Sequence, residues 1–285
     1  MKTKLVIYQV FTRTFGNKNL TRKENGTLAE NGVGKMNDFD ESVLRRIHDF
    51  GVTHLWYTGV IRHATCTDYS SFGIPCQNPR VVKGRAGSPY AITDYYDIDP
   101  DIAVNVDERM AEFEALISRT HGEGLKMIID FVPNHVARQY KSIAKPQGVS
   151  DLGEDDDLGK HFDPQNNFYY CPGEALDLSG VAENEYANGA KPYHEYPAKC
   201  TGNDRFDSHP QQNDWYETVK LNYGVDYCDA GGRSYHYHPI PSTWKKMTEI
   251  LLFWAAKGID GFRCDMAEMV PIEFWEWVIP RVRSW

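Results

Sequence analysis

Three times along this chain, an amphipathic segment ends at a glycine and a short apolar run follows it. The runs are Val52–Thr58, Leu125–Phe131 and Ile259–Asp265, and the glycines are Gly51, Gly124 and Gly258. Glycine commonly ends helices, and apolar runs of this length are typical of buried strands. Repeated helix–strand units of this kind predict an α/β fold with a parallel sheet, whose strands end at one common edge.

A further apolar run, Leu5–Phe11, predicts a strand ahead of these units. Helices are expected after Asp40, from about Val106, after Ser242 and around Pro271, with Asp40 and Ser242 as candidate N-caps. The helix after Asp40 has an apolar face of Val43, Leu44, Ile47 and Phe50. The helix after Ser242 has an apolar face of Trp244, Met247, Ile250, Leu251 and Trp254. Because the strands are almost continuously apolar, we expect a sheet that is covered on both faces.

Residues 136–235 depart from this pattern, since they are rich in Asp, Asn, Gly and Tyr and poor in aliphatic side chains. A segment of this length is too long for a structureless loop in a compact domain. We therefore predict an inserted subdomain. The chain would then divide into residues 1–135 with the first three strands, the inserted residues 136–235, and residues 236–285 with a helix, the fourth strand and a last helix.

The formal net charge is -9 and no run of basic residues occurs, which argues against a nucleic-acid partner. The chain has 7 Trp and 17 Tyr, whose flat faces either fill a core or stack on sugar rings. A neutral polymer therefore fits this composition better than a polyanion. No stretch is long and apolar enough to span a membrane, and the oligomeric state stays open.

Lys2 and Lys4 resemble the basic start of a signal peptide, but Leu5–Phe11 is too short for its apolar part. We therefore expect a cytoplasmic protein whose thiols are reduced. The 6 cysteines show no paired Cys-x-x-Cys spacing, which argues against a zinc site made from them.

Polar residues end two of the predicted strands, in the segments Asp130–His135 and Gly261–Asp265. Alternate residues of a strand point to the same side, so Arg263 and Asp265 are expected to face one way. A neighbouring guanidinium favours the ionised form of a carboxyl group. These residues either form part of an active site or an ion pair that only stabilises the fold.

Four segments occur in the order of the characteristic motifs of one family: Ile7–Phe11, Ser88–Tyr95, Asp130–His135 and Gly261–Asp265, with a weaker fifth at Lys220–Asn222. Together they resemble the α-amylase family of glycoside hydrolases and transglycosylases, which act on α-glucosidic bonds. The resemblance implies a TIM-type (β/α)8 barrel. This chain would supply about the first four βα units, with the irregular subdomain inserted after the third strand.

The resemblance also implies a role for each matching residue. Asp265 would be the nucleophile that forms a covalent glucosyl intermediate, and Arg263 its positively charged partner. Asp130 would support the site through hydrogen bonds to the arginine. Tyr90 would stack on the sugar being cleaved, and His135 would form a hydrogen bond with one of its hydroxyl groups.

Asn134 matches a calcium ligand of many family members, and the acidic insertion could supply further oxygen ligands, so calcium is a candidate cofactor. Two positions depart from the family pattern. Glu268 and Met269 stand where many members carry lysine and histidine, which leaves recognition on the leaving-group side in doubt. Ala91 stands where enzymes acting on chain ends often have aspartate, which disfavours an exo-acting glucosidase.

Retaining glycosidases need a second carboxyl group about 5–5.5 Å from the nucleophile, to act as acid and base. In the family this glutamate and a stabilising aspartate come later than the position of Trp285. We therefore expect the N-terminal portion of a longer retaining α-amylase-like enzyme, inactive alone, whose parent cleaves α-glucans such as starch, glycogen or malto-oligosaccharides. A transglycosylase and a non-catalytic glucan-binding or partner protein are the alternatives. Hydrolysis versus transfer, the glucan, its chain length and endo or exo action stay open.

Overall fold

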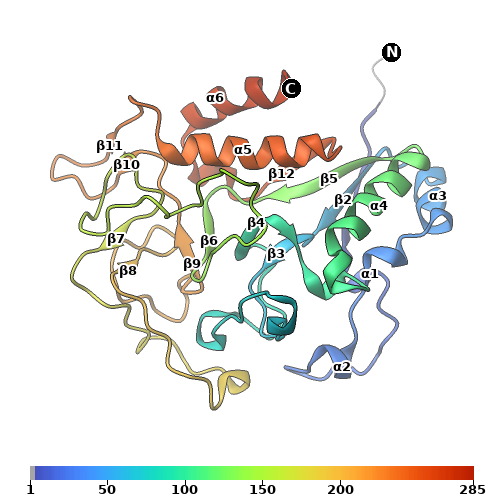
Figure 1. Ribbon diagram of the computed structural model, residues 1–285, viewed down its shortest axis with the longest axis horizontal. Helices are drawn as coiled ribbons and strands as arrows, with labels where there is room; N and C mark the ends of the chain where they lie inside the picture. Colours follow the sequence, from blue (N-terminus) through green and yellow to red (C-terminus); the bar gives the residue numbers. More distant parts are fainter. Residues whose placement is uncertain (1–3) are drawn as a thin grey trace.

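The computed structural model describes residues 4–285, so Lys2, part of the basic start considered above, lies outside them. A parallel four-stranded sheet in the order β1-β2-β5-β12 forms the centre of the molecule (Figure 1). Its strands are β1 (Ile7–Phe11), β2 (His54–Thr58), β5 (Lys126–Phe131) and β12 (Gly261–Cys264). The four predicted strands are therefore confirmed, and because all pairs are parallel their carboxyl ends share one edge.

The longer helices are α3 (Glu41–Asp49), α4 (Arg109–Gly122), α5 (Ser242–Ala256) and α6 (Ile272–Arg283), and α1 (Thr12–Phe15) and α2 (Leu28–Asn31) are single turns. Short 3-10 turns occupy Met36–Asp38, Ser70–Phe72, Pro79–Val81, Pro100–Ile102, Val106–Glu108, Glu185–Ala187 and Ala267–Met269. The predicted cap at Asp40 is confirmed, because its side chain accepts from the Val43 N–H across 2.8 Å. The predicted cap at Ser242 is wrong: Pro241 takes the N-cap position and Ser242 is the first helical residue.

The apolar face predicted for α5 is confirmed, since Trp244, Met247, Ile250, Leu251 and Trp254 are all buried. The face predicted for α3 holds at Leu44, which is buried, but fails at Phe50, which is 89% exposed. The helix ends at Asp49, so Phe50 occupies the C-cap, just beyond the last helical residue.

One face of the sheet is well covered and the other is not. Leu55 and Tyr57 of β2 and Met127 and Ile129 of β5 are buried, in one apolar cluster with residues of α3, α4 and α5. The alternate positions Trp56 and Ile128 are only partly buried, as is all of β12. The prediction of a sheet covered on both faces is therefore wrong, and Ile7 in the outer strand β1 is 55% exposed. Among residues 4–285, β1 and β12 each pair with a single strand of this sheet.

A β-hairpin that the sequence patterns did not indicate follows β2. It consists of β3 (Ile61–His63) and β4 (Ile92–Ile98), and every residue of β4 is buried. Arg62 forms buried ion pairs with Asp94 at 3.0 Å and Asp97 at 3.2 Å. The hairpin therefore anchors the loop between its strands, including Tyr90 just before β4.

The inserted segment consists mostly of irregular backbone and of short antiparallel pairs. The pairs are β6 (His135–Ala137) with β9 (Thr218–Lys220), β7 (Tyr170–Cys171) with β8 (Ala198–Lys199), and β10 (Val225–Asp226) with β11 (Ser234–Tyr235). Its own apolar cluster is small and contains Tyr169, Cys171, Ala198 and Cys200. The predicted domain boundaries stay predictions, and β6 crosses the first of them. None of the described helices combines the length and the apolar character that crossing a membrane requires.

Candidate active site

The polar residues at the ends of β5 and β12 lie together. Arg263 and Asp130 are direct partners in the register of these two strands. One nitrogen of Arg263, Nη1, donates to Oδ1 of Asp265 at 2.7 Å and to Oδ1 of Asp130 at 3.2 Å. A single guanidinium therefore joins two carboxylates that are only 6% and 7% exposed. We call Asp130, Arg263 and Asp265 the carboxylate cluster.

Two aromatic rings fix the guanidinium of this cluster. Arg263 Cζ lies 5.1 Å from the ring centre of Trp56 and 5.4 Å from that of Tyr90, within cation–π distance. Trp56 Nε1 also donates to Oδ2 of Asp130 at 3.1 Å. The sequence reasoning placed Tyr90 here but missed Trp56. The signal was available, because Trp56 lies in the predicted strand Val52–Thr58.

Burial raises the pKa of Asp265 above its ordinary value, while the charge and hydrogen bond of Arg263 lower it and the charge of Glu268 adds to the rise. Arg263 thus acts in the expected direction but does not outweigh burial. Burial also raises the pKa of Asp130 to about 6, although the Trp56 N–H and Arg263 oppose it. Both carboxyl groups therefore titrate closer to neutral pH than free aspartate does.

The backbone turns sharply at Asp265. Its N–H donates to the Phe131 carbonyl at 2.8 Å, which extends the pairing of β12 with β5 by one residue. The next residue, Met266, has a φ of 48°, in the left-handed region that side chains other than glycine seldom adopt. Such a backbone persists only where the surrounding structure holds it, and it is typical of functional sites. Here it ends the strand directly after the Asp265 carboxylate.

His135 is 4% exposed, and its ring centre lies 5.3 Å from that of Trp215. Burial lowers the pKa of His135 to about 4, helped by the charge of Lys220 and opposed by the backbone of Tyr90. The imidazole is therefore neutral at physiological pH. Because Tyr90 is close to both His135 and Arg263, the structure brings these predicted substrate residues to one side of the carboxylate cluster.

Asn134 lies apart from the cluster and faces a lysine. Its Oδ1 accepts from Lys220 Nζ at 2.5 Å, and its Nδ2 donates to the Gly202 carbonyl at 2.8 Å. Lys220 is 2% exposed and also pairs with Asp204 at 2.6 Å. Calcium on Asn134 would have to displace this buried ammonium group, so the residues around Asn134 do not fit calcium. Lys220 belongs to a weak motif match in the sequence, but its role as an internal cation follows only from the structure.

No glutamate within residues 4–285 forms a hydrogen bond or ion pair with a member of the carboxylate cluster. A cleft of about 660 Å³ has a lining that includes Cys264, Glu268, Trp275, Tyr227 and Tyr235, but no member of the carboxylate cluster. Its aromatic rings offer stacking surfaces near the end of β12.

Comparisons with known protein families and with individual proteins show what this chain is similar to. The model of the α-amylase catalytic domain matches residues 9–276. An α-glucosidase of Apis mellifera is 24% identical over 266 residues, which are 93% of this chain and 35% of the relative. The amino acid transporter heavy chain SLC3A1 of Mus musculus is 23% identical over 270 residues, covering 93% of this chain and 29% of its own. The chain thus spans about a third of these curated relatives.

Among solved structures, an α-amylase from Lactobacillus plantarum superposes with a TM-score of 0.53 at 24% identity. The match covers 98% of this chain and 42% of that protein, and at this identity it supports the fold alone. The family match, in contrast, extends over nearly all of the described residues and includes both strand ends of the carboxylate cluster. The chain therefore belongs to the α-amylase family.

Proposed function

We propose that the protein carrying this domain is a retaining glycoside hydrolase that cleaves α-glucosidic bonds in α-glucans or malto-oligosaccharides. The observation that carries the proposal is the carboxylate cluster, in which Arg263 holds Asp265 at the carboxyl end of β12. In this proposal the four parallel strands are part of a (β/α)8 barrel. Active sites of such barrels lie at the carboxyl ends of the strands, where this cluster lies.

Asp265 would attack the anomeric carbon of the bound glucose, forming a bond from its carboxylate oxygen to that carbon. The bond from the carbon to the leaving oxygen breaks, and this oxygen takes a proton from an acid that residues 4–285 do not identify. Water then attacks the same carbon, gives up a proton to the conjugate base of that acid, and releases Asp265. Arg263 would hold Asp265 in line for both steps, and Asp130 and Trp56 would hold Arg263.

Tyr90 and His135 would bind the glucose that is attacked. Arg263 lies over one face of the partly exposed Tyr90 ring, so the opposite face would be the one that stacks on a sugar ring. His135 is neutral, and its Nδ1 is 3.2 Å from Asn134 Nδ2, whose amide can only donate. The proton of the imidazole is therefore on Nε2, which faces the Tyr90 backbone and would donate to a sugar hydroxyl bound beside Tyr90.

The test is to trap the covalent intermediate on the full-length protein with a fluorinated glucosyl or maltosyl fluoride, which slows the second step more than the first. Trypsin should release residues 264–281 with the mass of one added glycosyl unit, because Arg263 and Arg281 bound this peptide. Fragmentation should place the sugar on Asp265 and exclude Glu268, Glu273 and Glu276, which lie in the same peptide.

The Asp265→Asn variant should lose the adduct and at least about a thousandfold in kcat on soluble starch. Asp260→Asn is a matched control, because Asp260 lies at the amino end of β12 and accepts from His121 and the Met127 N–H, both at 2.8 Å. It should keep both adduct and activity. A sugar attached elsewhere, or near-normal turnover by Asp265→Asn, would refute the proposal.

The relationship to a transporter heavy chain supports a second candidate, a non-catalytic partner subunit. That candidate predicts no adduct and no turnover at full length, with a partner protein recovered instead. A transglycosylase would form the same adduct on Asp265. It would be recognised by longer oligosaccharide products when malto-oligosaccharide acceptors are supplied, since only the second step differs.

A further inference from the structure

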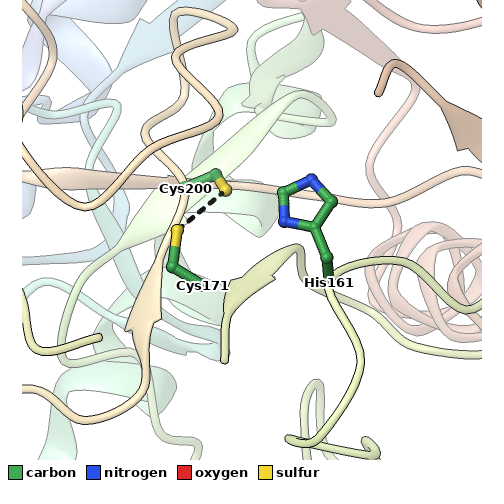
Figure 2. Close-up of side chains that lie close together, drawn as sticks. All are labelled: His161, Cys171 and Cys200. Carbon is green, nitrogen blue, oxygen red and sulfur yellow. Dashed lines mark hydrogen bonds between the residues drawn. The ribbon is translucent and has the colours of Figure 1, made fainter. Parts of the chain in front are cut away.

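A cluster of one histidine and two cysteines lies in the inserted segment, outside the carboxylate cluster (Figure 2). The ligand atoms of His161, Cys171 and Cys200 all lie within 4.8 Å of one another. Cys171 ends β7, Cys200 directly follows β8, and His161 comes from the loop that leads to β7. Figure 2 shows the two sulfur atoms facing each other with the imidazole ring beside them.

Strand pairing, rather than sequence spacing, brings the two cysteines together. Tyr170 pairs with Lys199 and Cys171 with Ala198, and the Cys200 N–H donates to the Tyr169 carbonyl at 3.0 Å. Cys171 and Cys200 are thus diagonal neighbours on the same face of the pair. For this reason the lack of a Cys-x-x-Cys spacing does not exclude that both cysteines bind the same metal ion.

The distance between the sulfur atoms suits a bound metal. Sγ of Cys171 and Sγ of Cys200 are 3.9 Å apart, and both thiols are free. Two zinc–sulfur bonds of about 2.3 Å at a tetrahedral angle place their sulfur atoms about 3.8 Å apart. A disulfide would instead need the sulfurs to approach to about 2.05 Å.

The third residue presents a free lone pair. His161 Nδ1 is 2.6 Å from the Tyr170 carbonyl, which can only accept, so Nδ1 carries the proton of the neutral ring. Nε2 is buried and has no hydrogen-bond partner among the described residues. A ring nitrogen held by a backbone carbonyl while the other is left open is the usual arrangement of a metal-binding histidine.

We propose that His161, Cys171 and Cys200 bind one zinc ion. Two thiols and one imidazole are soft and borderline ligands, which suit zinc rather than calcium or magnesium. Cys171 is 7% exposed and Cys200 is 0% exposed. Binding replaces two S–H bonds by two zinc–sulfur bonds and releases two protons, and the imidazole binds as the neutral base. A water molecule would complete the tetrahedral coordination.

The consequence would be structural. The inserted segment has only a small apolar cluster of its own, in which both cysteines take part. Zinc would join the His161 loop to β7 and β8, and so stabilise a part of the inserted segment that consists mostly of irregular backbone. The proposal is independent of the glycosidase chemistry, since none of its three residues belongs to the carboxylate cluster.

The experiment uses the untagged full-length protein, kept reduced with a phosphine, stripped with a chelator and then given one equivalent of zinc sulfate before desalting. Elemental analysis should find close to one zinc per chain in the wild type. Cys171→Ser, Cys200→Ser and His161→Gln should each retain less than about a tenth of it. Cobalt in place of zinc should give a near-ultraviolet thiolate charge-transfer band that Cys171→Ser weakens.

Cys76→Ser is the matched control, because Cys76 is an exposed cysteine outside the cluster. It should bind zinc as the wild type does. Circular dichroism of each variant before zinc is added separates loss of a ligand from loss of folding, and His161→Gln tests the site without removing a thiol. Equal zinc in wild type and the three variants would overturn the proposal. A Cys171–Cys200 disulfide in the protein as isolated, two hydrogens lighter and without zinc, would do so as well.

Discussion

The guanidinium of Arg263 donates to the carboxylate of Asp265 across 2.7 Å, from two positions earlier in the same chain segment. The spacing of alternate strand residues brings the two side chains to one side of the sheet. Because the same nitrogen also contacts Asp130, the orientation of Asp265 depends on a residue of the neighbouring strand β5. The catalytic rate and the pH dependence of stability should therefore both change when Arg263 or Asp130 is replaced.

Replacing Arg263 by lysine should lower kcat on an α-glucan by about 10- to 100-fold, with a smaller change in KM. The ammonium group keeps the charge but cannot hold both carboxylates in the geometry of a planar guanidinium, and a charged hydrogen bond contributes about 1.5–3 kcal/mol. Steady-state kinetics of the full-length enzyme measure the effect. Arg45→Lys, at a surface ion pair with Glu123, is the control. Unchanged kcat in Arg263→Lys would contradict the positioning role.

Ionisation of Asp130 should destabilise the fold. Burial raises the pKa of Asp130 to about 6 from an ordinary 3.8, so its contribution to stability is present below pH 3.8 and lost as the pH rises through 6. Urea unfolding of wild type and Asp130→Asn should show the wild type losing up to about 3 kcal/mol relative to the variant between pH 4 and 7. A constant difference across this range would show that burial does not raise the pKa of Asp130, and Asp107→Asn, at an exposed side chain, is the control variant.

The contribution of His135 to stability should change with pH in the opposite direction to that of Asp130, over a similar pH range. Burial lowers the pKa of His135 to about 4 from an ordinary 6.5, so its contribution is complete above pH 6.5 and lost as the pH falls towards 4. The wild type should lose up to about 3 kcal/mol relative to His135→Gln on acidification from pH 7 to 4. His209→Gln, at an exposed histidine, is the control variant. If His135→Gln lost stability in parallel with the wild type, the imidazole of His135 would not be neutral by burial.

The melting temperature should not change when calcium is chelated with EGTA, because Lys220 places an ammonium group at Asn134. Lys220→Met keeps the length of the side chain but leaves Asn134 Oδ1 and Asp204 without their cation. We expect a loss of about 2–3 kcal/mol, below the 3–5 kcal/mol of a fully buried broken pair because the Asp204 side chain is 38% exposed. Lys160→Met, at an exposed ion pair, is the control. A fall in melting temperature with EGTA that calcium reverses would contradict this assignment.

The sequence predicted what depends on local periodicity and on motif order. The strands that carry Asp130 and Arg263 and the buried face of α5 follow from apolar spacing, and these are the elements that position the carboxylate cluster. The β3–β4 hairpin was missed because its short strands are held by the buried ion pairs of Arg62, whose partners lie about thirty positions later.

The parts of the site that could not be predicted depend on distant contacts. The contact of Trp56 with Asp130, the contact of Lys220 with Asn134 and the grouping of Cys171 with Cys200 each join residues far apart in the chain. Burial decides the pKa of Asp265, and no spacing rule reports how much water a side chain loses on folding. The exposed faces of β1 and β12 were also missed, because apolar strands indicate burial only when something packs on them.

The left-handed backbone at Met266 has a consequence for sequence variation at this strand end. In a library that randomises position 266, glycine, asparagine and aspartate would pass with little strain, whereas valine, isoleucine and threonine would be depleted. Their depletion would come from the turn itself, although position 266 touches none of the proposed chemistry. A tolerated-residue profile at this position would therefore report the shape of the chain beside Asp265, separately from the catalytic demand on Asp265.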